Sequence, residues 1–120
     1  MLSTMQRMLI VDDERAICEC LQQFFAAKGF SVTWAFSGEE ALTRLTEDYA
    51  DVILLDINLP GLSGIEVLRR ARALHPSVRI IMVTGLDRDD LRTEAFEHGA
   101  VAYITKPFDF SDHTWSAVFT

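Results

Sequence analysis

Five short apolar runs alternate along this chain with longer segments in which apolar residues recur at helical spacing. The expected strands are residues 7–11, 31–35, 52–55, 79–83 and 102–105. Helices are expected between them at residues 14–28, from Ser37 onward, from Ser63 to His75, and at 88–98. Strands that alternate with helices build a parallel sheet with helices on both faces. The pattern therefore predicts an α/β protein with a doubly wound, five-stranded parallel sheet.

Local signals support these helix boundaries. Ser37 with Glu40, and Ser63 with Glu66, have the spacing of a capping box, in which the first side chain accepts a hydrogen bond from a backbone N–H of the first turn. Gly29 fits a C′ position after the first helix, where a glycine can take positive φ. That first helix carries an apolar stripe at helical spacing: Ile17, Cys20, Leu21, Phe24 and Phe25.

Size and composition limit what the chain can be. With 120 residues, 49% of them hydrophobic, it can form one domain with a core of its own. A net charge of −7 argues against direct nucleic-acid binding, which needs a basic surface. No apolar segment approaches the roughly 20 residues of a membrane span, so we expect a cytoplasmic protein that does not contact membranes.

Cys18 and Cys20 point about 200° apart on a helix, which predicts one buried thiol, one exposed thiol and no disulfide.

Polar side chains follow four of the expected strands at the point where each ends. Asp12 and Asp13 follow the first strand, Asp56 the third, Thr84 the fourth and Lys106 the fifth. Doubly wound sheets of this length commonly have strand order 2-1-3-4-5 and bind ligands at the carboxyl edge. That order brings the three aspartates together, and two carboxylates about 5 Å apart repel by roughly 3 kcal/mol at an effective dielectric near 20. The sequence therefore predicts a site for a divalent cation, and oxygen ligands of this kind suit Mg²⁺.

Each of these residues also has an ordinary structural interpretation. Asp12 and Asp13 fit the cap and first turn of a helix. Asp56 fits a solvated carboxylate at a strand end, Thr84 a β-branched strand terminator, and Lys106 a surface cation. Taken singly, each signal leaves both interpretations open. Four chemically matched groups at four strand ends favour a phosphoryl-transfer site.

The same residues carry a resemblance to the receiver domain of bacterial two-component response regulators. The resemblance implies a flavodoxin-like receiver fold, with residues 1–120 as a single receiver domain and residues 7–108 as its core. Residues 109–120 depart from it, because the family's last helix is longer. We expect an atypical or truncated final helix there, with Trp115, Val118 and Phe119 inward. The resembling motifs are Ile10-Val11-Asp12-Asp13-Glu14, Leu54-Leu55-Asp56-Ile57-Asn58-Leu59-Pro60-Gly61, Val83-Thr84-Gly85 and Tyr103-Ile104-Thr105-Lys106-Pro107-Phe108.

The resemblance also implies a metal site and a phosphoacceptor. Asp56 would accept the phosphoryl group. Asp13 and Asp56 would bind Mg²⁺ directly, and the backbone carbonyl of Asn58 would be a third ligand. Asp12 would act on the ion through a bound water. The implied chemistry therefore places Asp56 at the centre of the site.

Further roles follow from the same resemblance. Lys106 would pair with Asp56 at rest and with a phosphoryl oxygen afterwards, and the bond from Lys106 to Pro107 would be cis. Thr84 would donate to another phosphoryl oxygen, and Tyr103 would move from exposed to buried as Thr84 shifts. Three further positions would modulate access to the phosphoryl group: Asn58, Gly85 and Leu86.

The implied function is a signalling switch rather than an enzyme with an outside substrate. A sensor histidine kinase or a histidine phosphotransfer protein would donate the phosphoryl group to Asp56. The face formed by the fourth strand, the following helix and the fifth strand would then contact an output domain or a downstream protein, or form a phosphorylation-dependent homodimer. Three alternatives are an interaction module independent of phosphorylation, an aspartyl phosphohydrolase and a flavin carrier. A phosphohydrolase would need a general acid at position 58, which Asn58 cannot provide. A flavin carrier would need a phosphate-binding loop after the first strand, where Asp12, Asp13 and Glu14 would instead repel a flavin phosphate.

Overall fold

A computed structural model describes residues 5–119 of the chain. Each predicted strand and helix up to residue 105 is present, and every end that the sequence predicted lies at or within one residue of the observed one. Within residues 5–119, no helix combines the length and the hydropathy needed to cross a membrane. The elements are β1 (Arg7–Val11), α1 (Arg15–Ala27), β2 (Ser31–Ala35), α2 (Gly38–Glu47), β3 (Val52–Leu55), α3 (Gly64–Leu74), β4 (Arg79–Thr84), α4 (Asp89–Glu97), β5 (Ala102–Thr105) and the 3₁₀ turn η1 (Ser116–Val118).

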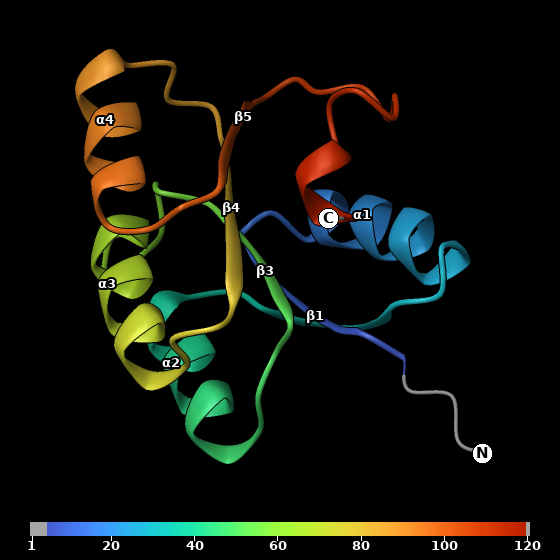
Figure 1. The fold of residues 1–120 in the computed structure, drawn as a ribbon, viewed down its shortest axis with the longest axis horizontal. Coiled ribbons are helices and arrows are strands. Elements are labelled where there is room, and N and C mark those ends of the chain that lie inside the picture. Colours follow the sequence, from blue (N-terminus) through green and yellow to red (C-terminus); the bar gives the residue numbers. More distant parts are fainter. Residues whose placement is uncertain (1–4, 120) are drawn as a thin grey trace.

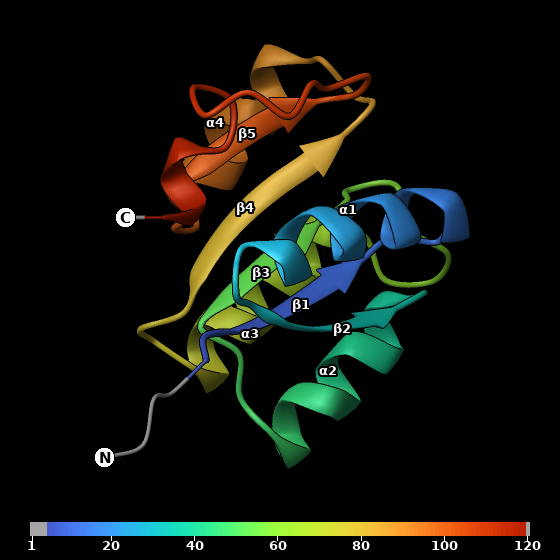
Figure 2. The same ribbon diagram turned by 90° about the vertical axis from the view of Figure 1, so that its right-hand side faces the viewer.

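All five strands are parallel and lie in the order β2-β1-β3-β4-β5, which confirms the predicted topology. Figure 2 shows β2 and β5 at opposite edges of the twisted sheet. The register pairs Val11 with Leu55, and Leu55 with Met82. Because the last residues of β1 and β3 are level, the residues that follow them emerge side by side at one edge.

Helices α2, α3 and α4 cover one face of the sheet, which we call the α2–α4 face (Figure 1). Its core is aliphatic, because alternate strand residues point toward these helices. The helices contribute Ala41 and Leu45 from α2, and Leu68 and Ala71 from α3, all buried. The strand residues on this face include Leu9, Val11, Ile53, Leu55, Ile80 and Met82.

The opposite face is covered by α1 together with residues 106–119, and we call it the α1–tail face (Figure 1). Its core is rich in aromatic side chains. Phe25 of α1 and Trp115 of the tail are fully buried, with ring centroids 5.3 Å apart. The indole Nε1 of Trp115 donates to the carbonyl of Asp109 at 2.6 Å. The tail is therefore packed onto the sheet although it has little regular structure.

Two predictions about this face are wrong in detail. The final helix is truncated to the three-residue 3₁₀ turn η1, and Trp115 and Val118 are buried as predicted, but Phe119, which was expected inward, is 48% exposed. In α1 the buried cysteine is Cys18, whereas Cys20, which the apolar stripe included, is exposed. Helical rotation explains the second error, since Cys18 lies three and seven residues before buried Leu21 and Phe25. Both thiols are free, as predicted.

The helix starts follow the capping signals only in part. Ser37 and Ser63 each accept a hydrogen bond from the backbone N–H three residues later, at 3.1 and 3.4 Å. The Glu40 carboxylate reaches back to the backbone N–H of Phe36, one residue earlier than a standard capping box requires. Glu66 pairs with arginines of its own helix instead. The serines therefore form the caps, and the glutamates make other contacts.

Candidate phosphoryl-transfer site

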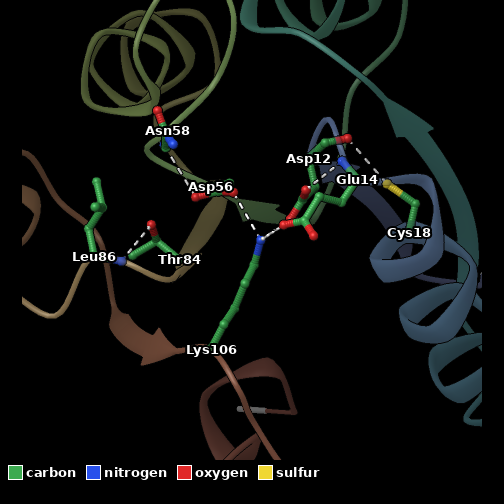
Figure 3. A network of polar contacts seen from close by, with 8 residues as sticks. All are labelled: Asp12, Glu14, Cys18, Asp56, Asn58, Thr84, Leu86 and Lys106. Atoms are coloured by element: carbon green, nitrogen blue, oxygen red, sulfur yellow. Dashed lines mark hydrogen bonds and ion pairs between the residues drawn. The ribbon is translucent and has the colours of Figure 1, made fainter.

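Three buried polar residues stand at the carboxyl edge of the sheet. Asp12 is 2%, Asp56 4% and Thr84 0% exposed, and they come from the ends of β1, β3 and β4. Figure 3 shows the carboxylates of Asp12 and Asp56 on either side of the ammonium of Lys106, which follows β5, with Thr84 nearby at the end of β4. Polar side chains are seldom fully buried unless they are paired or hydrogen-bonded. The buried polar side chains of the described residues are therefore gathered at this edge of an otherwise apolar core.

Asp56 is fixed by contacts on both sides of its carboxylate. Its backbone N–H donates to the carbonyl of Val11 at 3.0 Å, which continues the pairing of β3 with β1. Oδ1 accepts the backbone N–H of Asn58 at 3.2 Å, and Oδ2 accepts the ammonium of Lys106 at 3.0 Å. The two oxygens therefore have different partners, one neutral and one charged.

The two carboxylate oxygens of Asp12 make different contacts, one within the turn before α1 and one with a cation. Its Oδ1 accepts the backbone N–H of Glu14 at 2.9 Å, and its Oδ2 lies 2.8 Å from Lys106 Nζ. The helix cap itself is Glu14, whose side chain makes no capping hydrogen bond. Burial raises the pKa of the Asp12 carboxyl, and the hydrogen bond from Lys106 only partly opposes that rise. Asp12 is therefore not the helix cap: one of its oxygens supports the turn before α1, and the other faces Lys106.

Lys106 is the central cation of the site. Its ammonium contacts Asp12, Asp56 and Glu14, and its side chain is only 14% exposed. Burial alone would lower the pKa of Lys106, but the three carboxylate hydrogen bonds outweigh it and raise the pKa. The bond from Lys106 to Pro107 is cis, as the resemblance implied. Lys106 is therefore a largely buried cation paired with three carboxylates and not a surface lysine.

The aspartates also fit a metal ion. Asp12, Asp13 and Asp56 each offer a carboxylate oxygen, and these oxygens lie within 4.8 Å of one another. Asp13 is exposed, so the group is open to solvent on one side. Hard divalent cations such as Mg²⁺ prefer oxygen ligands and retain several waters. The donor set and its opening therefore fit an Mg²⁺ ion held by carboxylates.

Thr84 connects the site to the loop that follows β4. Its Oγ1 accepts the backbone N–H of Leu86 at 3.3 Å, and the carbonyl of Leu86 accepts the hydroxyl of Tyr103 at 2.5 Å. Gly85 is exposed, and a Cβ there would meet nothing within 4 Å. Arg92 of α4 lies over the Tyr103 ring, 4.7 Å from its centroid. A continuous set of contacts thus runs from Thr84 to α4.

Two residues at the site were not predicted from the sequence. Glu14 reaches Lys106 through an exposed side chain at the start of α1, and its only sequence signal is its place next to the aspartate pair. Gly64 opens α3 so close to β3 that a Cβ would lie 2.0 Å from the carbonyl oxygen of Asp56. The serine cap at Ser63 marked the start of this helix but not that close approach. The predicted Asn58 is exposed and contributes its backbone N–H to Asp56.

Comparison with known proteins agrees with this arrangement. Residues 8–115 match the response regulator receiver domain family. Sporulation initiation phosphotransferase F of Bacillus subtilis is 35% identical over 107 residues, which cover 89% of this chain and 86% of that protein. Transcriptional regulatory protein DltR of Streptococcus agalactiae is 40% identical over 103 residues, which cover 86% of this chain. Only 46% of DltR is covered, so the chain spans less than half the length of that relative.

Solved structures show the same fold. A CheY-like response regulator receiver domain protein from Methanospirillum hungatei has a TM-score of 0.85 and 35% identity, covering 88% of this chain and 85% of that one. A chain of the CheX–CheY–BeF3–Mg²⁺ complex from Borrelia burgdorferi has a TM-score of 0.88 and 31% identity, covering 96% of this chain and 90% of that one. The chain therefore belongs to the response regulator receiver domain family, and it is a receiver domain of two-component signalling.

Proposed function

We propose that this receiver domain is a phosphorylation switch in which Asp56 accepts a phosphoryl group from a phosphohistidine. The donor would be a sensor histidine kinase or a histidine phosphotransfer protein in the cytoplasm. The observation that carries the proposal is the pairing of the buried Asp56 carboxylate with Lys106 at 3.0 Å, beside two further aspartates. Phosphoryl transfer mainly requires that the protein position the reacting groups and place positive charge around the transferred oxygens. This edge of the sheet offers both.

The proposed transfer exchanges one bond for another. An oxygen of Asp56 attacks the phosphorus, the new P–O bond forms, and the P–N bond to the donor imidazole breaks. The imidazole nitrogen then takes up a proton. Lys106 moves from Asp56 to a phosphoryl oxygen, and the hydroxyl of Thr84 donates to another. The result is an aspartyl phosphate at the end of β3.

Mg²⁺ belongs to this proposal as the resident cation. Asp13, Asp56 and the carbonyl of Asn58 would hold it, and Asp12 would act through a bound water. When bound, the ion supplies positive charge against the negative charge of the phosphoryl oxygens. The chain's own residues orient the acceptor: the Asn58 N–H holds one oxygen of Asp56, and the close approach at Gly64 fixes the backbone behind it.

The lifetime of the phosphorylated state depends on water access. Gly85 leaves open space where the phosphoryl group would extend. The side chain of Leu86 cannot orient a water by hydrogen bonding, and Asn58 offers no acid. We therefore expect slow self-hydrolysis, which is the only enzymatic chemistry that the proposal gives this chain.

Output would follow from the contacts around Thr84. A shift of Thr84 toward the phosphoryl group pulls on the Leu86 N–H, and Leu86 in turn holds the Tyr103 hydroxyl. Such a pull can bias a segment that has two arrangements. The face of β4, α4 and β5 would then contact an output domain or downstream protein, or pair with a second copy. An alternative is an interaction module of the same fold that acts without phosphorylation.

The test is phosphorylation by a small-molecule donor. The protein and its Asp56→Asn variant are incubated with acetyl phosphate and Mg²⁺ and then weighed by intact-mass spectrometry. We expect one added phosphoryl group in the wild type and none in the variant. A gain in both would place the acceptor elsewhere. No gain in either, with both proteins folded by circular dichroism, would favour the interaction module.

A further inference from the structure

The ammonium of Lys106 has three carboxylate partners. Nζ lies 2.8 Å from Asp12, 3.0 Å from Asp56 and 3.0 Å from Glu14. A lysine ammonium has three N–H donors and no acceptor. Each donor can therefore face one carboxylate, and Glu14 occupies one of the three. Glu14 thus shares a cation that the proposed reaction needs at Asp56.

Glu14 differs from the other two partners in its surroundings. Its side chain is 61% exposed, whereas those of Asp12 and Asp56 are almost fully buried. It also lies outside the group of aspartate oxygens that could share a metal ion. Its backbone N–H donates to Asp12 Oδ1, which fixes its main chain beside the site. Figure 3 shows the Glu14 and Asp12 carboxylates on the same side of the Lys106 ammonium, with Asp56 on the other.

The proposed transfer places opposing demands on Lys106. At rest its ammonium holds Asp56 Oδ2, yet Asp56 must release it in order to attack phosphorus. Asp12 and Asp56 are also needed by the cation of the metal site, so Lys106 and that cation compete for the same oxygens. Glu14 is the one partner that neither the attack nor the metal group requires. It can therefore retain Lys106 at the site while the aspartates change partners.

We propose that Glu14 is a positioning residue for Lys106. It draws the ammonium toward the rim of the site, loosens its hold on Asp12 and Asp56, and keeps it within reach of an incoming phosphoryl oxygen. The role in transfer rests on the function proposed above. The effect on the charge balance of the resting site does not, so it can be measured without any phosphoryl donor.

The first test is a double-mutant cycle on Mg²⁺ binding, measured by calorimetry with the metal alone. Glu14→Gln should weaken binding roughly two- to fivefold, the size expected of an exposed ion pair, because Lys106 then falls back on Asp12 and Asp56. In a Lys106→Met background the same substitution should have a much smaller effect. Glu19→Gln is the matched control: it removes the same charge from α1, and Glu19 makes no ion pair within the described residues.

The cycle has clear outcomes. An equal effect of Glu14→Gln with and without Lys106 would mean that Glu14 acts only through long-range charge, and the proposal would be wrong. Circular dichroism verifies folding, and Lys106→Gln replaces the methionine variant if that one is unfolded. Coupling between the two positions, absent for Glu19→Gln, would support the proposal.

The second readout separates binding from transfer. With acetyl phosphate as donor, Glu14→Gln should lower the maximal phosphorylation rate roughly two- to fivefold without raising KM, because losing a negative charge does not hinder an anionic donor. Equal maximal rates for Glu14→Gln and Glu19→Gln would overturn the transfer role. If the wild type takes up no phosphoryl group, the proposed function fails, whereas the Mg²⁺ cycle still decides the contact between Glu14 and Lys106.

Discussion

The two faces of the sheet are shielded from water in different ways. The α2–α4 face is covered by three regular helices and filled with aliphatic side chains. The α1–tail face has one helix, and the remaining strand surface lies under a tail with a single 3₁₀ turn. There Trp115 and its aromatic neighbours cover what a helix would otherwise cover. Burial of apolar area, rather than regular secondary structure, is what a sheet face requires.

The difference predicts where stability is concentrated. On the α2–α4 face, the buried apolar area is spread over many aliphatic side chains of similar size. On the α1–tail face, one large side chain connects the tail to α1, with Phe25 and Phe108 both within 5.3 Å of the Trp115 ring by centroid distance. Substitutions on the two faces should therefore differ in their effect on stability.

The largest effect is expected from Trp115→Ala. Removing a fully buried indole should lower the free energy of unfolding by about 3–5 kcal/mol, measured by urea denaturation. Phe119→Ala is the comparison within the same tail, and its half-exposed ring should cost less than about 1 kcal/mol. Similar losses for both variants would mean that the tail contributes as a whole and that Trp115 is not its anchor.

On the other face, the most sensitive position is the start of α3. Gly64→Ala should cost about 2–3 kcal/mol, because the added methyl collides with the backbone of Asp56 and must push α3 away from the sheet. It should also slow phosphorylation by acetyl phosphate. Gly85→Ala adds the same methyl group in open space, and its stability should change by no more than about 0.5 kcal/mol. Equal stability of the two variants would contradict the close approach at Gly64.

At the carboxyl edge of the sheet, removing a polar group should instead stabilise the protein, because the buried Asp12 charge is held there at a cost in stability. Burial raises the pKa of Asp12, so the folded state binds this proton more tightly than the unfolded state does. The free energy of unfolding therefore falls as pH rises from the ordinary value of 3.8 to the raised one, and the cost persists at pH 7. Asp12→Asn should stabilise the protein by on the order of 1 kcal/mol at pH 7 without Mg²⁺.

Two measurements check this sign. The gain from Asp12→Asn should shrink as urea denaturation is repeated at lower pH, where the wild-type carboxyl also becomes neutral. Asp13→Asn removes the same charge from an exposed neighbour and should give a smaller gain. A gain independent of pH, or the same gain at both positions, would show that general repulsion and not burial is responsible.

The smallest expected effect concerns the chemistry of the two thiols on α1. Burial raises the pKa of Cys18 to about 12, whereas Cys20 is exposed. A thiol reagent at pH 8 should therefore modify one cysteine in the native protein and both in urea, as counted by intact mass. Rapid native labelling of Cys18 would mean that the α1–tail face opens readily despite its aromatic packing.

Much of the fold was predictable because its signals are local. The apolar runs predicted the strands to within a residue. The serine caps at Ser37 and Ser63 predicted the starts of α2 and α3. The same signals failed where tertiary packing decides which of several nearby side chains is buried. The stripe on α1 assigned Cys20 to the core, although Cys18 is the cysteine on the same helix face as the buried Leu21 and Phe25. Phe119 was expected inside, but the tail is too short and irregular to bury it.

The candidate site divides in the same way. Asp56, Thr84 and Lys106 could be named because each lies at the end of a strand or directly after it, and parallel strands expose their carboxyl ends at one edge. Glu14 and Gly64 could not be named from local sequence. Their importance arises from groups 92 residues away in the case of Lys106, and from the backbone of another element in the case of Asp56.

By itself, the sequence determined the five strands, their alternation with helices and the types of polar group at their ends, because periodicity and strand-end chemistry depend on neighbouring residues; the strand order came from the common topology of such sheets. Only the tertiary structure decided which carboxylates share the Lys106 ammonium, how closely α3 approaches Asp56, and that an aromatic tail replaces a helix. Those features depend on distances between segments far apart in the chain. Packing and electrostatics act through such distances, and no local pattern encodes them.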